Sequence, residues 1–114
     1  MAAREQALRF HAKTDKRIVC TVDDANGAPV ILTGGTITWK LSRSSGSEAL
    51  VTASVGSGIT ISDQSISPGE FIVVLAAAST TGYSGKYYHE ARVTLGGAAE
   101  VVCYGPVTVL PSLG

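Results

Sequence analysis

The sequence predicts an all-β protein, an antiparallel β-sandwich of seven to eight short strands. Two observations lead to this prediction: apolar and polar residues alternate along several short segments, and clusters of Gly, Ser and Thr separate those segments about every ten residues. The composition agrees, since 13 of the 114 residues are glycine and only 16% are charged. A chain of this length can build one domain around one modest core.

Each expected strand has one side that the alternation marks as buried. Residues 36–42 are the clearest case, because Ile37, Trp39 and Leu41 alternate with Thr and Lys. A polar turn within residues 23–29 precedes this strand, as at the edge of a sandwich. The other expected strands are residues 7–13, 17–22, 49–55, 58–62, 70–76, 86–95 and 99–110, the last with a bulge or break at Gly105-Pro106.

The inward residues of these strands form the expected core. Trp39 is the single tryptophan, and it faces strands that carry Cys20 and Tyr87. This arrangement resembles the centre of an immunoglobulin-like sandwich, in which two antiparallel sheets pack face to face. The expected core consists of Ile18, Val22, Ile37, Trp39, Leu41, Ile59, Ile61, Phe71, Val73, Leu75, Tyr87, Ala91, Val93, Val101 and Val109.

Residues 1–9 are expected to form an N-terminal arm that leads into a single sandwich domain of residues 10–114. The arm is helical or disordered in this interpretation, because residues 4–7 have good helix propensity. Five of the nine basic residues lie within the first 17 positions. Glu5 and Asp15 dilute that charge, which favours a solvated face over a binding site.

The charge balance limits the classes of partner. A formal net charge of +0 gives no general attraction to nucleic acid or to an anionic membrane. No apolar run approaches the roughly 20 residues that cross a bilayer. Charged residues also interrupt the N-terminus where a secretory signal needs a continuous apolar run. We therefore expect neither nucleic acid nor a membrane among the partners.

The residues that could carry chemistry are few. Cys20 and Cys103 are expected to face inward, where they form either an intrachain disulfide or two buried thiols. His89 is expected to be a packed, hydrogen-bonded residue beside Tyr87. The sequence contains no nucleophile motif, no metal-ligand spacing and no phosphate loop. We therefore expect no catalytic residue, metal or cofactor, and no enzymatic activity.

Apolar side chains also occur on the expected outer faces of two strands. Outward rows of this kind usually mark a surface that another molecule covers. The mean hydropathy of +0.25 is also high for a small monomer. The interface candidates are therefore Ile72, Val74, Val102 and Tyr104, with Arg4 and Arg9 of the arm lying against an acidic neighbour.

Several short phrases occur along the chain in a distinctive order. They are Val22-Asp23-Asp24 with Gly27-Ala28-Pro29, Leu32-Thr33-Gly34, Ile37-Thr38-Trp39-Lys40-Leu41, Gly69-Glu70-Phe71, Gly85 to Val93, and Val102 to Val109. In this order they resemble small immunoglobulin-like virion modules of tailed phages and prophages, such as the N-terminal domains of baseplate upper proteins and short decoration proteins of heads or tails.

The resemblance implies a non-enzymatic structural protein of the virion, made in the bacterial cytoplasm. Such a protein is a capsid decoration or a neck or tail component. Its partners are copies of itself, as a homo-oligomer, and other virion proteins.

Two other hypotheses remain open. A glycan- or receptor-binding module of a phage fibre or adhesin would bind carbohydrate through tyrosines such as Tyr83, Tyr88 and Tyr104. It requires two or three tyrosines around a shallow groove on one exposed face. An enzyme or redox protein would instead require an accessible cysteine next to His89 or a basic residue.

Overall fold

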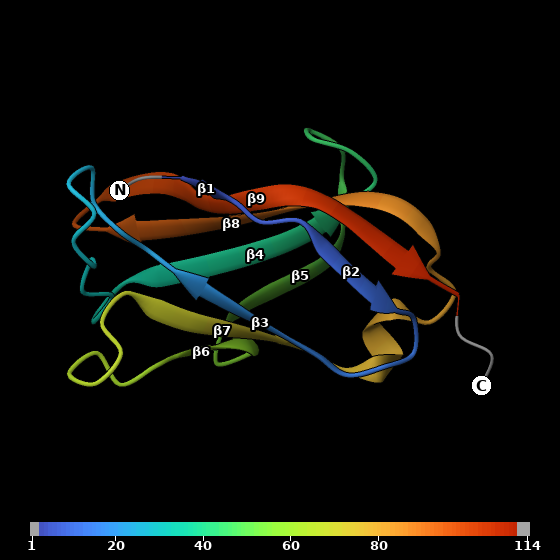
Figure 1. Ribbon diagram of the computed structural model, residues 1–114, viewed down its shortest axis with the longest axis horizontal. Coiled ribbons are helices and arrows are strands. Elements are labelled where there is room, and N and C mark those ends of the chain that lie inside the picture. The colour runs from blue at the N-terminus through green and yellow to red at the C-terminus, as the bar shows by residue number, and fades with distance from the viewer. Residues whose placement is uncertain (1–2, 112–114) are drawn as a thin grey trace.

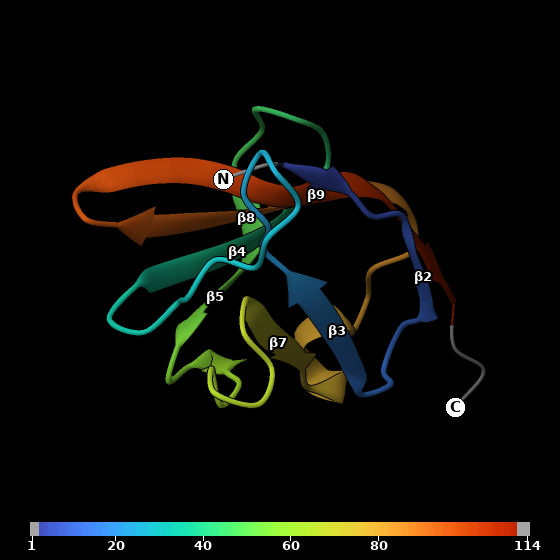
Figure 2. The same cartoon turned by 60° about the vertical axis from the view of Figure 1, so that its left-hand side comes forward.

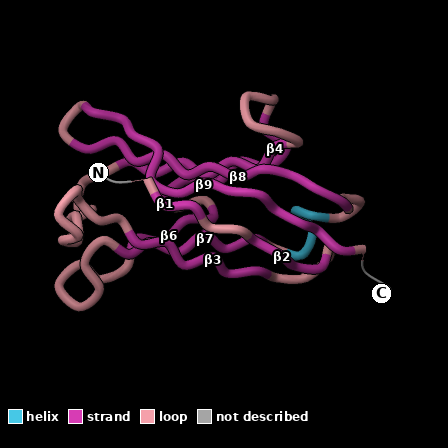
Figure 3. Tube along the Cα trace, turned by 45° about the horizontal axis from the view of Figure 1, so that its top comes forward, coloured by secondary structure: helices cyan, strands magenta, loops and turns pink. Residues whose placement is uncertain are grey.

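The computed structural model describes residues 3–111, and strands account for most of them (Figure 3). A single-turn 3-10 helix, Ala77–Thr80, connects β7 to β8. The all-β prediction is therefore confirmed. The strands are β1 Arg4–Glu5, β2 Leu8–His11, β3 Lys16–Thr21, β4 Thr36–Ser42, β5 Ala49–Val55, β6 Gly58–Ile61, β7 Glu70–Leu75, β8 Gly85–Leu95 and β9 Ala98–Leu110.

These strands form one mixed sheet in the order β1-β9-β8-β4-β5-β6-β7-β3, and β2 also pairs with β9. The sheet curls, so that β3 and β7 lie opposite β4, β8 and β9 (Figures 1 and 2). The prediction of purely antiparallel pairing is wrong. Strands β1 and β2 run parallel to β9, and β5 runs parallel to β6. Alternation within a strand cannot reveal these pairings, because it does not encode the direction of the neighbouring strand.

The core lies inside the curl. Trp39 of β4 and Phe71 of β7 belong to one buried cluster, and neither exposes any surface. The predicted core is confirmed except at Ile61 and Val101, which are only half-buried. The cluster contains Leu8, Phe10, Ala12, Ile18, Cys20, Val22, Leu32, Ile37, Trp39, Leu41, Ala53, Ile59, Phe71, Val73, Leu75, Tyr87, Ala91, Val93, Val102, Cys103, Val107 and Val109.

A β-bulge in β9 overturns the predicted outward position of Val102. In the ladder with β8, Val101 pairs with Arg92 and Cys103 pairs with Ala91, so Val102 is an extra residue. A bulge of this kind interrupts the alternation of side chains. Consequently Val102 and Cys103 both point inward, exposing only 1% and 3% of their surface. The bulge precedes the predicted position at residues 105–106.

Strands at Arg4–Glu5 and Leu8–His11 are part of the sheet, so the expectation of a helical or disordered arm is wrong for these residues. Strands β1 and β2 both pair with β9, and the backbone N–H of Gln6 between them donates to the carbonyl of Tyr104 at 2.7 Å. Leu8 and Phe10 of β2 are 8% and 7% exposed and join the core. Tertiary burial therefore outweighs the local helix propensity.

Replacing Phe10 by Ala tests whether β2 is an integral strand. We expect the free energy of unfolding to fall by about 3 kcal/mol, because the truncation leaves a cavity between β2 and the core. Urea denaturation measures the change. The control is Arg9→Ala, since the neighbouring Arg9 is exposed and its loss should cost less than about 0.5 kcal/mol. Equal effects of the two substitutions would contradict this packing.

Candidate functional site

An apolar strip of Val19, Ile72 and Val74 lies on the outer face of the β3–β7 pair. In the antiparallel ladder Val19 pairs with Ile72, and Arg17 pairs with Val74, so these side chains share one face. Val19 is 50% exposed and Val74 is 42% exposed, whereas Ile72 is half-buried. The structure thus places Ile72 and Val74 outward, as expected. The sequence also contained a signal for Val19, which lies between the inward Ile18 and Cys20.

The predicted interface residues do not form one surface. Tyr104 pairs with Glu90 and points outward from β9, in the layer opposite the apolar strip. Val102 is buried, so no partner can contact it without unfolding the strand. Ile72 and Val74 are therefore separated from Tyr104 by the whole core.

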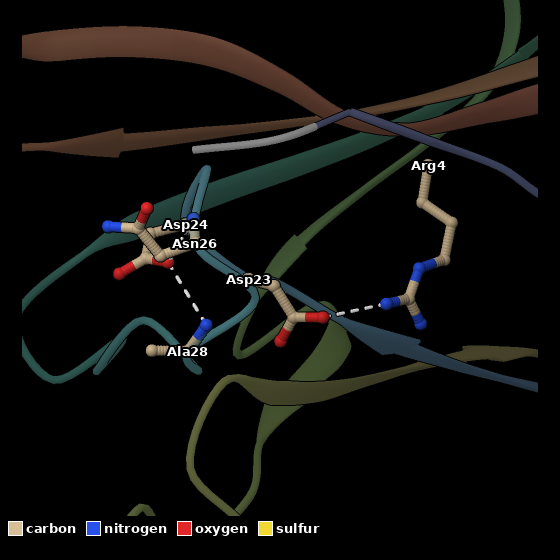
Figure 4. A network of polar contacts seen from close by, with 5 residues as sticks. All are labelled: Arg4, Asp23, Asp24, Asn26 and Ala28. Carbon is tan, nitrogen blue, oxygen red and sulfur yellow. Dashed lines mark hydrogen bonds and ion pairs between the residues drawn. The ribbon is translucent and has the colours of Figure 1, made fainter.

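Arg4 contacts an acidic residue of its own chain. Its Nη2 donates to Oδ2 of Asp23 at 2.7 Å (Figure 4). The side chains of Arg4 and Asp23 are 56% and 24% exposed, and ion pairs this accessible contribute at most about 1 kcal/mol. Arg9 points outward from β2 and is exposed. Of the two arginines, Arg9 is the one without an ion pair in the described part of the chain.

The acidic turn before β4 has a structural role in its own backbone. Oδ1 of Asp24 accepts hydrogen bonds from the backbone N–H groups of Asn26 at 2.8 Å and Ala28 at 3.0 Å (Figure 4). This is the turn-forming use of Asp that the sequence indicated. Among residues 3–111, no three His, Cys, Asp or Glu side chains gather in a way that could hold a metal ion.

A polar groove of about 280 Å³ lies on the outer face of β4 and β8. Thr38 and Lys40 of β4 and Glu90 and Arg92 of β8 line it. Lys40 stands directly opposite Glu90 in the ladder, so opposite charges alternate across the floor of the groove. Tyr104 also pairs with Glu90 and therefore borders the same face.

The four tyrosines divide between two places. Tyr88 and Tyr104 are half-buried and share the outer face of the β8–β9 pair. Tyr87 points inward, and its ring lies 5.9 Å from that of Tyr83, near the turn that precedes β8. The hydroxyl of Tyr87 bonds to the backbone of Ser84 and closes this turn.

A hydrogen-bonded chain of polar groups crosses the core. Nε1–H of Trp39 donates to Nδ1 of His89 at 3.0 Å, and Nε2 of His89 lies 2.6 Å from the carbonyl oxygen of Gln6. Nδ1 can accept only if it carries no proton, so the proton of the neutral ring lies on Nε2 and is donated to Gln6. Burial lowers the pKa of His89, which favours this neutral form. His89 is therefore the packed, bonded residue that the sequence predicted.

Cys20 and Cys103 meet in the interior as thiols, with their Sγ atoms 3.7 Å apart. Oε1 of Gln6 accepts a hydrogen bond from the thiol of Cys103 at 3.2 Å. It also lies 3.9 Å from Sγ of Cys20, as an alternative acceptor for the single thiol hydrogen that Cys20 can donate to Cys103. The hydrogen bond with Cys103 and burial both raise the pKa of Cys20. The hydrogen bond from Cys20 lowers the pKa of Cys103, with help from the charge of Arg4 and against the effect of burial.

The comparisons with known proteins assign no family. No protein-family model and no curated protein matches the sequence. A solved structure titled Tim-1 is 17% identical, with a TM-score of 0.48 over 99% of this chain and 98% of that one. Among the described residues, no helix has the length and apolar character needed to span a bilayer.

The buried state of His89 predicts how stability depends on pH. We expect the free energy of unfolding to decrease as the pH falls below about 6.5, because the unfolded chain then binds a proton that folded His89 excludes. The slope is at most about 1.4 kcal/mol per pH unit from this residue. Urea denaturation at a series of pH values measures it.

Two observations separate His89 from other groups that titrate. The variant His89→Gln should lose this pH dependence, because it removes the buried ring that excludes the proton. Nitrogen-15 NMR should show the Nε2–H tautomer of His89 near pH 6, just below the ordinary histidine pKa. A charged ring at that pH would contradict the hydrogen-bonded chain.

Proposed function

We propose that this protein is a non-enzymatic structural component of a phage virion, either a capsid decoration protein or a component of the neck or tail. It acts by packing against copies of itself and against other virion proteins. In this proposal the curled sheet is an immunoglobulin-like sandwich. The observation that carries the proposal is the apolar strip, Val19, Ile72 and Val74, on the outer face of β3 and β7.

The position of the strip favours protein contact. An exposed sheet face in a small monomer normally carries Lys, Glu or Thr, which keep strands from associating. Here three apolar side chains adjoin on two paired strands, and β3 is the last strand of the sheet order. Burying such surface contributes roughly 25 cal/mol for each Å² removed from water. The flanking Arg17 and Glu70 supply a charged rim around the apolar centre.

The virion assignment has a separate support, which is the order of sequence phrases between Val22 and Val109. In the structure, two of these sequence segments lie on strands that form the core. The segment Ile37 to Leu41 is the centre of β4, and the segment Gly85 to Val93 is most of β8. Both strands place alternate residues in the core, so the phrases describe the framework of the fold. The residues of the apolar strip, Val19, Ile72 and Val74, lie outside those phrases and on the outer face, where substitutions can change the partner without changing the core.

Replacing Val74 by Lys tests the contact. We expect the fold to persist, because Val74 is exposed, and self-association to weaken by about tenfold or more, because the substitution places a charge in the apolar centre. Light scattering at several protein concentrations measures the association. The matched control is Ile31→Lys, since Ile31 is 53% exposed but lies in the loop before β4.

Two outcomes would contradict this proposal. If Val74→Lys and Ile31→Lys associate as strongly as the parent, the strip is not the contact surface. If the parent is monomeric at every concentration and does not sediment with phage particles, a virion role through this face is wrong.

A second candidate function, glycan or receptor binding, is favoured by the outer face of β4, β8 and β9. Tyr88 and Tyr104 share this face with the groove lined by Lys40, Glu90 and Arg92. Tyrosine rings stack on the apolar faces of sugars, and paired charges bind their hydroxyl groups. Two tyrosines beside a shallow groove are the arrangement that this hypothesis requires.

Binding to a glycan microarray tests the second candidate. If the groove binds sugar, Tyr104→Ala should reduce the signal at least tenfold, because it removes the stacking surface. Tyr83→Ala is the control, since Tyr83 packs against Tyr87 away from the groove. Equal loss in both variants, or no binding by the parent, would remove this candidate.

A further inference from the structure

We propose that Cys20 and Cys103 are a redox-responsive pair that closes into a disulfide and fastens β3 to β9 across the core. The two strands are not neighbours in the sheet: β3 is one end of the strand order, and β9 lies near the other end. A bond between them would therefore join the two facing parts of the curl (Figure 2). This inference does not depend on the proposed virion role.

The positions of the sulfur atoms support bond formation. The Sγ atoms are already 3.7 Å apart, and a disulfide needs them at about 2.05 Å. Both cysteines are buried, at 2% and 3% exposure, so each thiol contacts the other and not a cysteine of another molecule. Bond formation within the chain is therefore favoured over bonds between chains.

The two thiols have unequal roles in the thiol–disulfide exchange that would form the bond. Cys103 forms a thiolate more readily, because Cys20 donates a hydrogen bond to it and Arg4 places a positive charge nearby. We infer that the Cys103 thiolate attacks one sulfur of a small-molecule disulfide, oxidised glutathione, and releases one glutathione thiolate. Cys20 then loses its proton and attacks Sγ of Cys103, which releases the second glutathione. Two cysteine thiols are oxidised and one glutathione disulfide is reduced to two thiols.

Gln6 controls access to the pair. Its side chain accepts a hydrogen bond from the thiol of Cys103 and lies 3.9 Å from Sγ of Cys20, and its Nε2 lies 3.4 Å from the carbonyl oxygen of Val19. Only the side chain of Gln6 is weakly held, because its backbone is fixed by hydrogen bonds with Tyr104 and His89. Rotations of a side chain take place far more often than the whole protein unfolds. Rotation of the Gln6 side chain therefore exposes the thiols, while its backbone stays bonded to Tyr104 and His89.

The disulfide should stabilise the fold. It joins residues separated by 83 positions, and closing so long a loop restricts the unfolded chain strongly. For a chain of this size we expect the melting temperature to rise by roughly 10 °C or more. Reduction with dithiothreitol should reverse the rise.

The experiment uses the parent protein. It is incubated with oxidised glutathione, denatured in an alkylating reagent and analysed by intact-mass spectrometry, and a parallel sample is melted. The expected result is a monomer that has lost two hydrogens and has no alkylated cysteine, with the higher melting temperature. Three results would each overturn the inference: two alkylated thiols, a stable glutathione adduct or disulfide-linked dimer, or an oxidised monomer with an unchanged or lower melting temperature.

Two variants test whether Cys20 and Cys103 form the disulfide and whether the side chain of Gln6 shields them from solvent. Cys20→Ala should lose the stabilisation by oxidation, and the comparison within the parent stands even if this variant does not fold. Gln6→Ala should oxidise several-fold faster than the parent, whereas Glu5→Ala, which changes the exposed neighbour, should oxidise at the parent rate. If Gln6→Ala oxidises no faster than Glu5→Ala, Gln6 does not cover the pair.

Discussion

The hydrogen-bonded chain from Trp39 through His89 to Gln6 is the constraint on which the rest of the structure depends. It places polar groups in the centre of the core, where each unpaired donor or acceptor would cost roughly 1–3 kcal/mol. Among the described residues, no buried side-chain nitrogen or oxygen lacks a partner. The ring of His89 keeps both of its hydrogen bonds only if the backbone carbonyl of Gln6 stays in place, next to β9. The requirement for hydrogen bonds therefore attaches the N-terminal strands to the sheet.

The same position of Gln6 determines the local shape of β9. Gly105 pairs with His89, and a Cβ atom at Gly105 would lie 2.5 Å from the carbonyl oxygen of Gln6. Only glycine permits this close approach of two backbones. The bulge at Val102, a few residues earlier, turns Cys103 inward toward Cys20 and Gln6. The bulge in β9 therefore brings Cys103 into contact with Cys20 and with the side chain of Gln6.

The outer faces of the two facing layers differ in chemistry. The β3–β7 face presents valine and isoleucine, whereas the β4–β8 face presents lysine, glutamate and arginine around a groove. A surface of the first kind favours contact with another apolar surface, and one of the second kind favours a polar ligand. In the proposed role the molecule would dock through the apolar face while the polar face remains in water. This division follows from a curled sheet, which buries one side of most strands and leaves the other side free.

The sequence alone determined the strands and the greater part of the core, because alternation with a period of two is a local property that burial imposes on each strand. Trp39 and Phe71, for example, were assigned to a common interior and lie there. The outward positions of Ile72 and Val74 followed from the same pattern. Only the tertiary structure decided the parallel pairing of β1 and β2 with β9, the inward turn of Val102, and the meeting of Cys20, Cys103 and Gln6. These features depend on contacts between residues far apart in the chain, and local alternation carries no information about such contacts.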